Sequence, residues 1–127
     1  MSYPTTARAA YVGNSVSTAS PARLLVMLVE RLVLDVERGL RAQVDGDFHE
    51  AHRHLVHAQD IVVELQTSLD VDKMPGGQEL ASLYEYLRTR LVTANVRRAP
   101  AATQQALVIA RHLCDTWRQA AMAAATQ

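Results

Sequence analysis

Apolar residues recur at helical spacing in four successive segments of the chain. The first segment begins at Ser20-Pro21, where the serine can cap free backbone N–H groups and proline suits the first helical position. It ends before Asp45-Gly46-Asp47, a sequence that favours a turn. We therefore predict a helix over 21–44. Its inward stripe consists of Leu25, Leu28, Val29, Leu32, Val36, Gly39 and Leu40.

Further breaks divide the rest of the chain into three more helices. Asp47 precedes the second helix and completes a capping-box pattern with Glu50. Pro75-Gly76-Gly77 separates the second helix from the third, and Pro100 opens the fourth. The inward stripes are Phe48, Ala51, Leu55, Ala58, Val62, Leu65 and Leu69 in the second helix, Leu80, Leu83, Tyr84, Leu87, Leu91 and Ala94 in the third, and Leu107, Ala110, Leu113, Cys114, Trp117 and Ala121 in the fourth.

Short connections between long amphipathic helices favour antiparallel neighbours. We therefore predict an all-α fold, an antiparallel up-down-up-down four-helix bundle over residues 20–124. The segment 1–19 carries only isolated apolar side chains and cannot fold by itself, so we expect an irregular, flexible N-terminal tail that caps the bundle surface. Its apolar residues are Tyr3, Tyr11, Val12 and Val16.

A second set of apolar residues lies off these inward stripes. They are Met27, Leu34, Val56, Val63, Tyr86, Val92, Val96, Val108 and Met122. Single apolar residues are common on protein surfaces, which is one interpretation. Their repetition on all four helices favours the other, a groove for a partner helix. In that case Tyr11 and Val16 of the tail can cover part of the groove when no partner is bound.

Composition narrows the class of protein. A chain of 127 residues suffices for one domain with a sizeable core. The formal net charge is zero, which argues against a general nucleic-acid binder or a protein of the membrane surface. No apolar run approaches the ~20 residues of a membrane span, and the first residues lack the apolar core of a signal peptide, so we expect a cytoplasmic protein without membrane insertion.

The charge is unevenly distributed along the chain. Up to Glu85 there are seven Lys or Arg and twelve Asp or Glu, whereas from Tyr86 onward there are six arginines and only Asp115. We expect the two halves to neutralise each other between neighbouring helices. The densest basic group is Arg88, Arg90, Arg97 and Arg98. It can complement a helix C-terminus, or it can form a contact patch for an acidic partner.

Histidines are the only candidates for a metal site. Four of them crowd the second helix, namely His49, His52, His54 and His57. Projection on the helix puts three on the solvent side and His54 at the edge of the core, and no further ligands of the di-iron type accompany them, so we expect no metal. Cys114 falls on an inward stripe and is expected to be a buried, unreactive thiol. We predict no catalytic residue, no cofactor and no enzyme activity.

Short motifs follow one another in a fixed order along nearly the whole chain. They are Asn14 to Leu24 (Asn-x-Val-x-Thr-Ala-Ser-Pro-x-x-Leu), Met27-Leu28, His57 to Leu65, Gly76-Gly77, Leu83 to Tyr86, Arg90 to Asn95 and Asp115-Thr116-Trp117. In this order they resemble the FliS family of flagellin-specific export chaperones, over about Tyr11 to Ala120. The chain departs from the family at Val29, where tyrosine is usual, in a shorter spacing after the glycine pair, and in a less acidic stretch after Asn95.

The resemblance implies a bundle that binds the C-terminal, helix-forming segment of newly made flagellin, keeps it unassembled and delivers it to the flagellar type III export gate, without a cofactor. Matching motif positions imply flagellin contacts at Tyr11, Asn14, Val16, Ile61, Leu65, Tyr84, Tyr86, Leu87, Leu91 and Asn95. Four of these, Leu65, Tyr84, Leu87 and Leu91, can equally be core residues, whereas Tyr11 and Tyr86 are not needed to fill the core.

Alternatives stay open at the level of the sequence. One is a helical adaptor or regulator that binds another secretion substrate or an anti-sigma factor. A metal-binding bundle enzyme rests on the histidines alone. The tail can cover the groove of its own chain, or it can exchange into a second copy and so give a homodimer.

Overall fold

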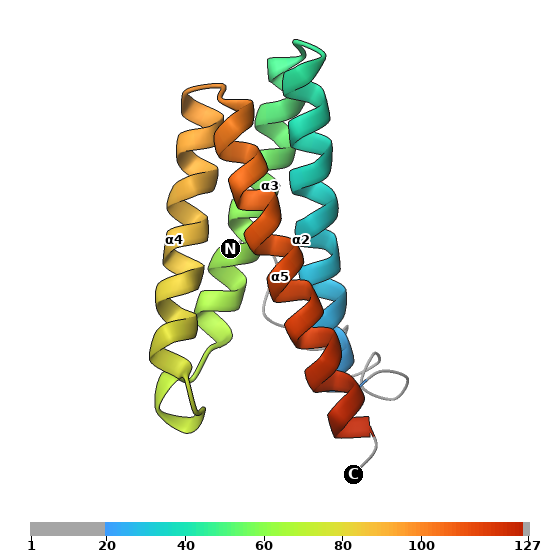
Figure 1. Cartoon of the computed structure of the whole chain (residues 1–127), viewed down its shortest axis with the longest axis vertical. Coiled ribbons are helices and arrows are strands. Elements are labelled where there is room, and N and C mark those ends of the chain that lie inside the picture. Colours follow the sequence, from blue (N-terminus) through green and yellow to red (C-terminus); the bar gives the residue numbers. More distant parts are fainter. Residues whose placement is uncertain (1–19, 126–127) are drawn as a thin grey trace, which may run out of the picture.

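Four long helices form the part of the chain that the computed structural model describes, residues 20–125 (Figure 1). Helix α2 spans Pro21–Val44, α3 spans Phe48–Ser68, α4 spans Gly77–Val96 and α5 spans Pro100–Ala125. A short 3-10 helix, η1, covers Val71–Lys73 between α3 and α4 and was not expected from the sequence. The predicted N-terminal tail, 1–19, lies outside the described residues.

The helix starts follow the capping residues, with one correction. The Ser20 side chain accepts a hydrogen bond from the Arg23 backbone N–H at 3.1 Å, as Ser-Pro predicts. Asp47 Oδ1 likewise accepts from the Glu50 backbone N–H at 3.1 Å. The predicted capping box is nevertheless only half formed, because the Glu50 carboxylate accepts from the Arg53 guanidinium at 2.8 Å and the Asp47 N–H donates to the Ala42 carbonyl.

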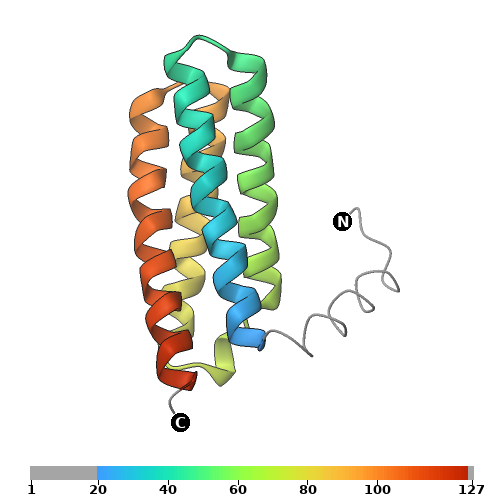
Figure 2. The same ribbon diagram turned by 90° about the vertical axis from the view of Figure 1, so that its right-hand side faces the viewer.

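Consecutive helices run in opposite directions, and α5 returns beside α2 to close the bundle (Figures 1 and 2). Each helix therefore packs against two neighbours. Helix α2 packs most extensively, against both α3 and α5, whereas α4 and α5 form the least extensive of the four contacts. The predicted antiparallel four-helix bundle is confirmed.

The inward stripes of all four helices meet in one apolar core. Its fully buried side chains include Val29, Leu32, Val36, Leu55, Val62, Leu87 and Leu91, all of them predicted. Val26 and Ile61 are buried as well, although the predicted stripes omitted them. Helices α2 and α3 approach closely at Gly39, where an added Cβ would lie 2.7 Å from the Leu55 Cδ2 atom.

A buried polar group fixes the end of the bundle at which α2 ends. Gln43 lies on α2, where its side-chain Nε2 donates to the Ala94 carbonyl at 3.0 Å. Its Oε1 atom accepts from the Thr103 hydroxyl of α5 at 2.6 Å. Because buried polar groups need partners, this set of bonds fixes α2 against the connection between α4 and α5. The sequence pattern gave no sign of it.

Gly77 is required for steric reasons at the start of α4. A Cβ at this position would lie 2.4 Å from the Val71 backbone carbonyl oxygen, so the η1 segment would have to move. We expect Gly77→Ala to lower the free energy of unfolding by about 1–3 kcal/mol, as overpacking does, in urea denaturation followed by circular dichroism.

Gly46→Ala is the matched control for this substitution. Gly46 has a positive φ of 77°, but an added Cβ would meet nothing within 4 Å. Its cost is therefore conformational only, about 1 kcal/mol. Wild-type stability of Gly77→Ala would contradict the close packing of η1 on α4.

Candidate partner-binding surface

Most of the predicted binding residues that the structure describes lie in the core. Ile61, Leu65, Tyr84, Leu87 and Leu91 are all buried. Packing accounts for these five side chains, and a partner could reach them only if the helices separated. Tyr11, Asn14 and Val16 lie outside the described residues. A binding role for any of these eight stays a prediction.

Tyr86 differs from its neighbour Tyr84 in exposure. Tyr84 is 1% exposed, and its hydroxyl accepts a hydrogen bond from Trp117 Nε1 at 3.2 Å. Burial raises the pKa of Tyr84, and the bond from Trp117 partly offsets this effect. The Tyr86 side chain is 52% exposed on the outside of α4 and has no packing role in the core. It is the predicted binding residue whose aromatic ring is open to a partner.

Asn95 lies at the rim of a shallow hollow at the end of the bundle. Its Nδ2 atom donates to His52 Nδ1 of α3 at 2.8 Å. The Arg98 guanidinium stacks over the Phe48 ring at 4.6 Å, and Val96 is exposed beside them. Arg98 holds a positive φ of 50°, a conformation that arginine adopts at some cost.

The second set of apolar residues is exposed much as predicted. The exposed members are Met27, Leu34, Val63, Tyr86, Val96, Val108 and Met122, while Val56 and Val92 are half-buried. They lie on four helices, and part of the set borders the seam between α3 and α4.

Two polar contacts fix the register of α3 against α4. Near one end His52 meets Asn95, and near the other Gln66 Nε2 donates to Glu85 Oε1 at 2.9 Å. The Arg88 guanidinium and this bond from Gln66 lower the pKa of Glu85 to about 2.

In an antiparallel pair of helices, the stretches of α3 and α4 that lie between these two polar contacts face each other. Val56 and Val63 of α3 and Val92 of α4 fall in these stretches, with Val96 just beyond. We call these four valines the apolar strip of the α3/α4 seam; Val63 and Val96 are exposed, and Val56 and Val92 are half-buried.

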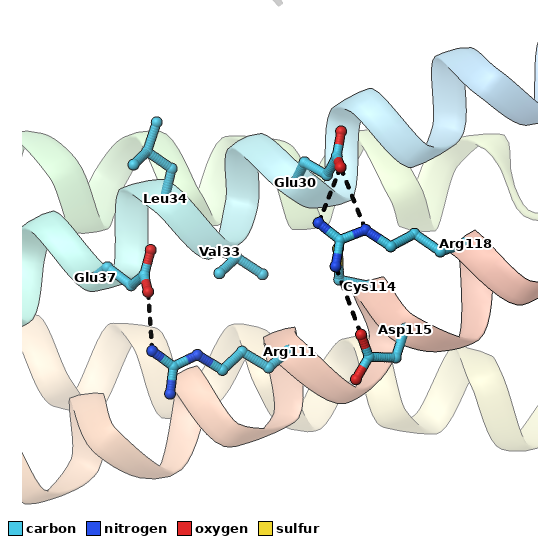
Figure 3. A pocket seen from close by; sticks show the side chains of 8 residues that line it. All are labelled: Glu30, Val33, Leu34, Glu37, Arg111, Cys114, Asp115 and Arg118. Atoms are coloured by element: carbon cyan, nitrogen blue, oxygen red, sulfur yellow. Dashed lines mark hydrogen bonds and ion pairs between the residues drawn. The ribbon is translucent and has the colours of Figure 1, made fainter.

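Two ion pairs cross the groove between α2 and α5 (Figure 3). Arg111 bonds Glu37 at 2.9 Å, and Arg118 bonds Glu30 at the same distance, with Val33 lying between the two pairs. Arginines of the last helix thus neutralise acids of the first, which confirms the expected neutralisation for these two pairs.

Cys114 lines the floor of the same groove and is buried (Figure 3). Burial raises the pKa of its thiol, so the nucleophilic thiolate is disfavoured. The predicted buried thiol is confirmed.

An ionic cluster between α2 and α3 escaped the sequence analysis. Asp35 of α2 is 0% exposed, and its Oδ1 accepts from Arg31 Nε at 3.0 Å. Its Oδ2 atom accepts from Nδ1 of His57, a half-exposed residue of α3. The one sequence signal was Arg31 placed four residues before Asp35 on a helix. The pairing with His57 could not be foreseen, because it depends on how the two helices pack.

The histidines of α3 do not gather at one site in the described part of the chain. His49, His52 and His57 are exposed and His54 is half-buried against Glu50, as the helix projection predicts. Within residues 20–125 no group of three or more His, Cys, Asp or Glu side chains is placed to hold a metal ion. In the same range no helix is long and apolar enough to span a membrane.

Comparison with known proteins decides the family. The family model described as flagellar protein FliS matches residues 4–124, nearly the whole chain. The chain belongs to the FliS family. It is 28% identical over 111 residues to the flagellar secretion chaperone FliS of Bacillus subtilis, covering 87% of this chain and 83% of the relative.

Two further FliS relatives agree. The flagellar secretion chaperone FliS of Escherichia coli is 28% identical over 110 residues, covering 85% of this chain and 81% of the relative. The flagellar secretion chaperone FliS of Vibrio cholerae is 25% identical over 111 residues, covering 85% of this chain and 80% of the relative. All three relatives are named flagellar secretion chaperones.

Proposed function

We propose that this protein binds the C-terminal, helix-forming segment of flagellin in the cytoplasm. Binding keeps flagellin from polymerising early and delivers it to the flagellar type III export apparatus. Membership of the FliS family over nearly the whole chain carries this proposal, because the relatives are named flagellar secretion chaperones.

The partly exposed apolar strip of the α3/α4 seam supports the proposal on physical grounds. A segment that is disordered alone and folds on binding loses conformational entropy, so it needs a large apolar interface to bind usefully. Val56, Val63, Val92 and Val96 along the α3/α4 seam, with Tyr86 on the outside of α4, offer such contacts without opening the core. Binding of this kind draws on surface burial and requires no cofactor.

Tyr86→Ala tests whether the exposed ring contributes to binding. Tyrosine is enriched among the interface residues whose truncation costs more than about 1 kcal/mol of binding free energy, so we expect the dissociation constant to rise about 10-fold. The melting temperature should change little, because half of the ring is already in water. Titration of the variant with a flagellin C-terminal peptide measures the first effect, and thermal unfolding measures the second. A large fall in melting temperature would place Tyr86 in the core.

Polymerisation of the host's flagellin gives a direct test of the proposed function. Purified flagellin is seeded to form filaments, and light scattering is followed with increasing amounts of this protein. We expect full suppression near one chaperone per flagellin. Unchanged filament growth at a several-fold excess of chaperone would contradict the proposal. Flagellin lacking its C-terminal segment is the binding control, since it should not co-elute with the chaperone in gel filtration.

A further inference from the structure

Arg90 of α4 is a half-buried cation whose side chain is only partly used within the bundle. Its Nε atom is buried and has no hydrogen-bond partner. Its Nη1 atom makes one long bond, 3.5 Å, to the Gln105 side-chain oxygen of α5. Its guanidinium lies 5.9 Å from the centre of the Tyr86 ring. Among the described residues no carboxylate lies within ion-pair distance of it.

Five of the other ten arginines in the described part of the chain have acidic partners. Arg31, Arg53, Arg88, Arg111 and Arg118 each pair with an aspartate or glutamate. A buried N–H group without a partner destabilises a protein, and a charged group does so more strongly. An apolar side chain at position 90 would avoid that loss. The guanidinium is therefore unfavourable to the unbound bundle, unlike the paired arginines.

The surroundings of Arg90 suit a helical peptide. Leu83, Tyr86 and Arg90 recur at helical spacing on α4, and the bond to Gln105 turns this face towards α5. Helices α4 and α5 pack least extensively, and they diverge towards the end where α5 finishes (Figure 1). On this face of α4, Tyr86 is half-exposed and Leu83 is half-buried. An unpaired guanidinium one turn from an exposed aromatic ring matches a peptide that carries a carboxylate one turn from an apolar residue.

We propose that Arg90 binds the carboxylate of an aspartate or glutamate side chain in the chaperoned peptide, while Tyr86 contacts the apolar residue beside it. This inference rests on the proposed function and adds an electrostatic anchor to it. A guanidinium forms two parallel hydrogen bonds with a carboxylate. Because the Arg90 Nε is buried, the peptide carboxylate would bind the outer Nη atoms, of which Nη1 makes only the long bond to Gln105. The anchor lies on the side of α4 that faces α5, whereas the apolar strip lies on the side that faces α3, so a peptide that wraps over α4 would contact both.

Arg90→Met and Arg88→Met form the matched pair that tests the anchor. Both remove a guanidinium from α4, but Arg88 is already paired with Glu85. Calorimetric titration with the C-terminal peptide of the host's flagellin, amidated at its end, measures the dissociation constant. We expect a rise of about 10- to 100-fold for Arg90→Met and less than about 3-fold for Arg88→Met. The melting temperature of Arg90→Met should equal or exceed that of the wild type.

Peptides with each acidic residue replaced by its amide identify the partner group. One replacement should weaken binding to the wild type about 10- to 100-fold and leave binding to Arg90→Met unchanged. Equal affinity of wild type and Arg90→Met, or a fall in melting temperature above about 5 °C, would overturn the anchor and leave the proposed function intact. Absence of peptide binding by the wild type would overturn both.

Discussion

Replacing Tyr84 with alanine is expected to lower the free energy of unfolding by about 3–5 kcal/mol, as for other large buried aromatic residues. Tyr84 is the largest fully buried side chain of the bundle, and its hydroxyl accepts the Trp117 indole N–H. The variant therefore loses core contacts, leaves a cavity and removes the acceptor for that N–H. Urea denaturation followed by circular dichroism measures the change.

Two further substitutions separate the contribution of the Tyr84 hydroxyl from that of its ring, and the core position from the surface position. Tyr84→Phe keeps the ring and removes only the acceptor of the Trp117 bond, so we expect a cost of about 1 kcal/mol. Tyr86→Ala truncates an exposed tyrosine on the same helix and should leave stability nearly unchanged. Similar losses for Tyr84→Ala and Tyr86→Ala would contradict the assignment of Tyr84 to the core and Tyr86 to the surface.

Removing both partners of Asp35 is expected to destabilise the bundle by about 3–5 kcal/mol. In the double variant Arg31→Met/His57→Leu, a carboxylate that is 0% exposed would lose the Arg31 Nε donor and the His57 Nδ1 donor together. An uncompensated buried charge costs far more than the ion pairs themselves contribute. The free energy of unfolding from urea denaturation gives the size of the effect.

Adding Asp35→Leu to the double variant completes the test. The triple variant has no buried charge, and apolar replacement of a buried ionic cluster is often neutral or stabilising, so most of the lost stability should return. As a control, Arg53→Met breaks an exposed pair with Glu50 and should have a much smaller effect. Full stability of the double variant would show that Asp35 does not depend on these two partners.

The helices were predictable because their signals are local. The helix boundaries depend on the backbone chemistry of a few residues and not on the rest of the fold. These residues are Ser20-Pro21, Asp47, Pro75-Gly76-Gly77 and Pro100. The apolar stripes likewise assigned most of the core, since one face of each helix must be buried. The bundle follows from these two facts and from the short connections.

What could not be predicted depends on contacts between helices. The bond between Asp35 and His57, the placement of Gln43 against Thr103 and the unpartnered Nε of Arg90 each depend on the rotation and register of two packed helices. Prediction also failed for residues that are close in the sequence. The Glu50 side chain bonds Arg53 and not the Asp47 N–H, so the predicted capping box is only half formed.

The predicted binding residues include a buried group and an exposed one. Motif matching selected residues by family position, and such positions include both core and surface residues. Burial then separates Ile61, Leu65, Tyr84, Leu87 and Leu91 from Tyr86. Among the candidates that the structure describes, the exposed Tyr86 and the half-buried Asn95 can meet a partner without rearrangement of the helices.

Calorimetric titration with a peptide of the C-terminal 40 or so residues of the host's flagellin tests the central claim most directly. We predict saturable binding of one peptide per chain, a negative heat-capacity change from apolar burial, and a gain of helical circular dichroism as the peptide folds. The same titration is made with a variant lacking residues 1–19, so that a tail lying over the binding surface cannot hide it. Failure of both proteins to bind the peptide would contradict the account.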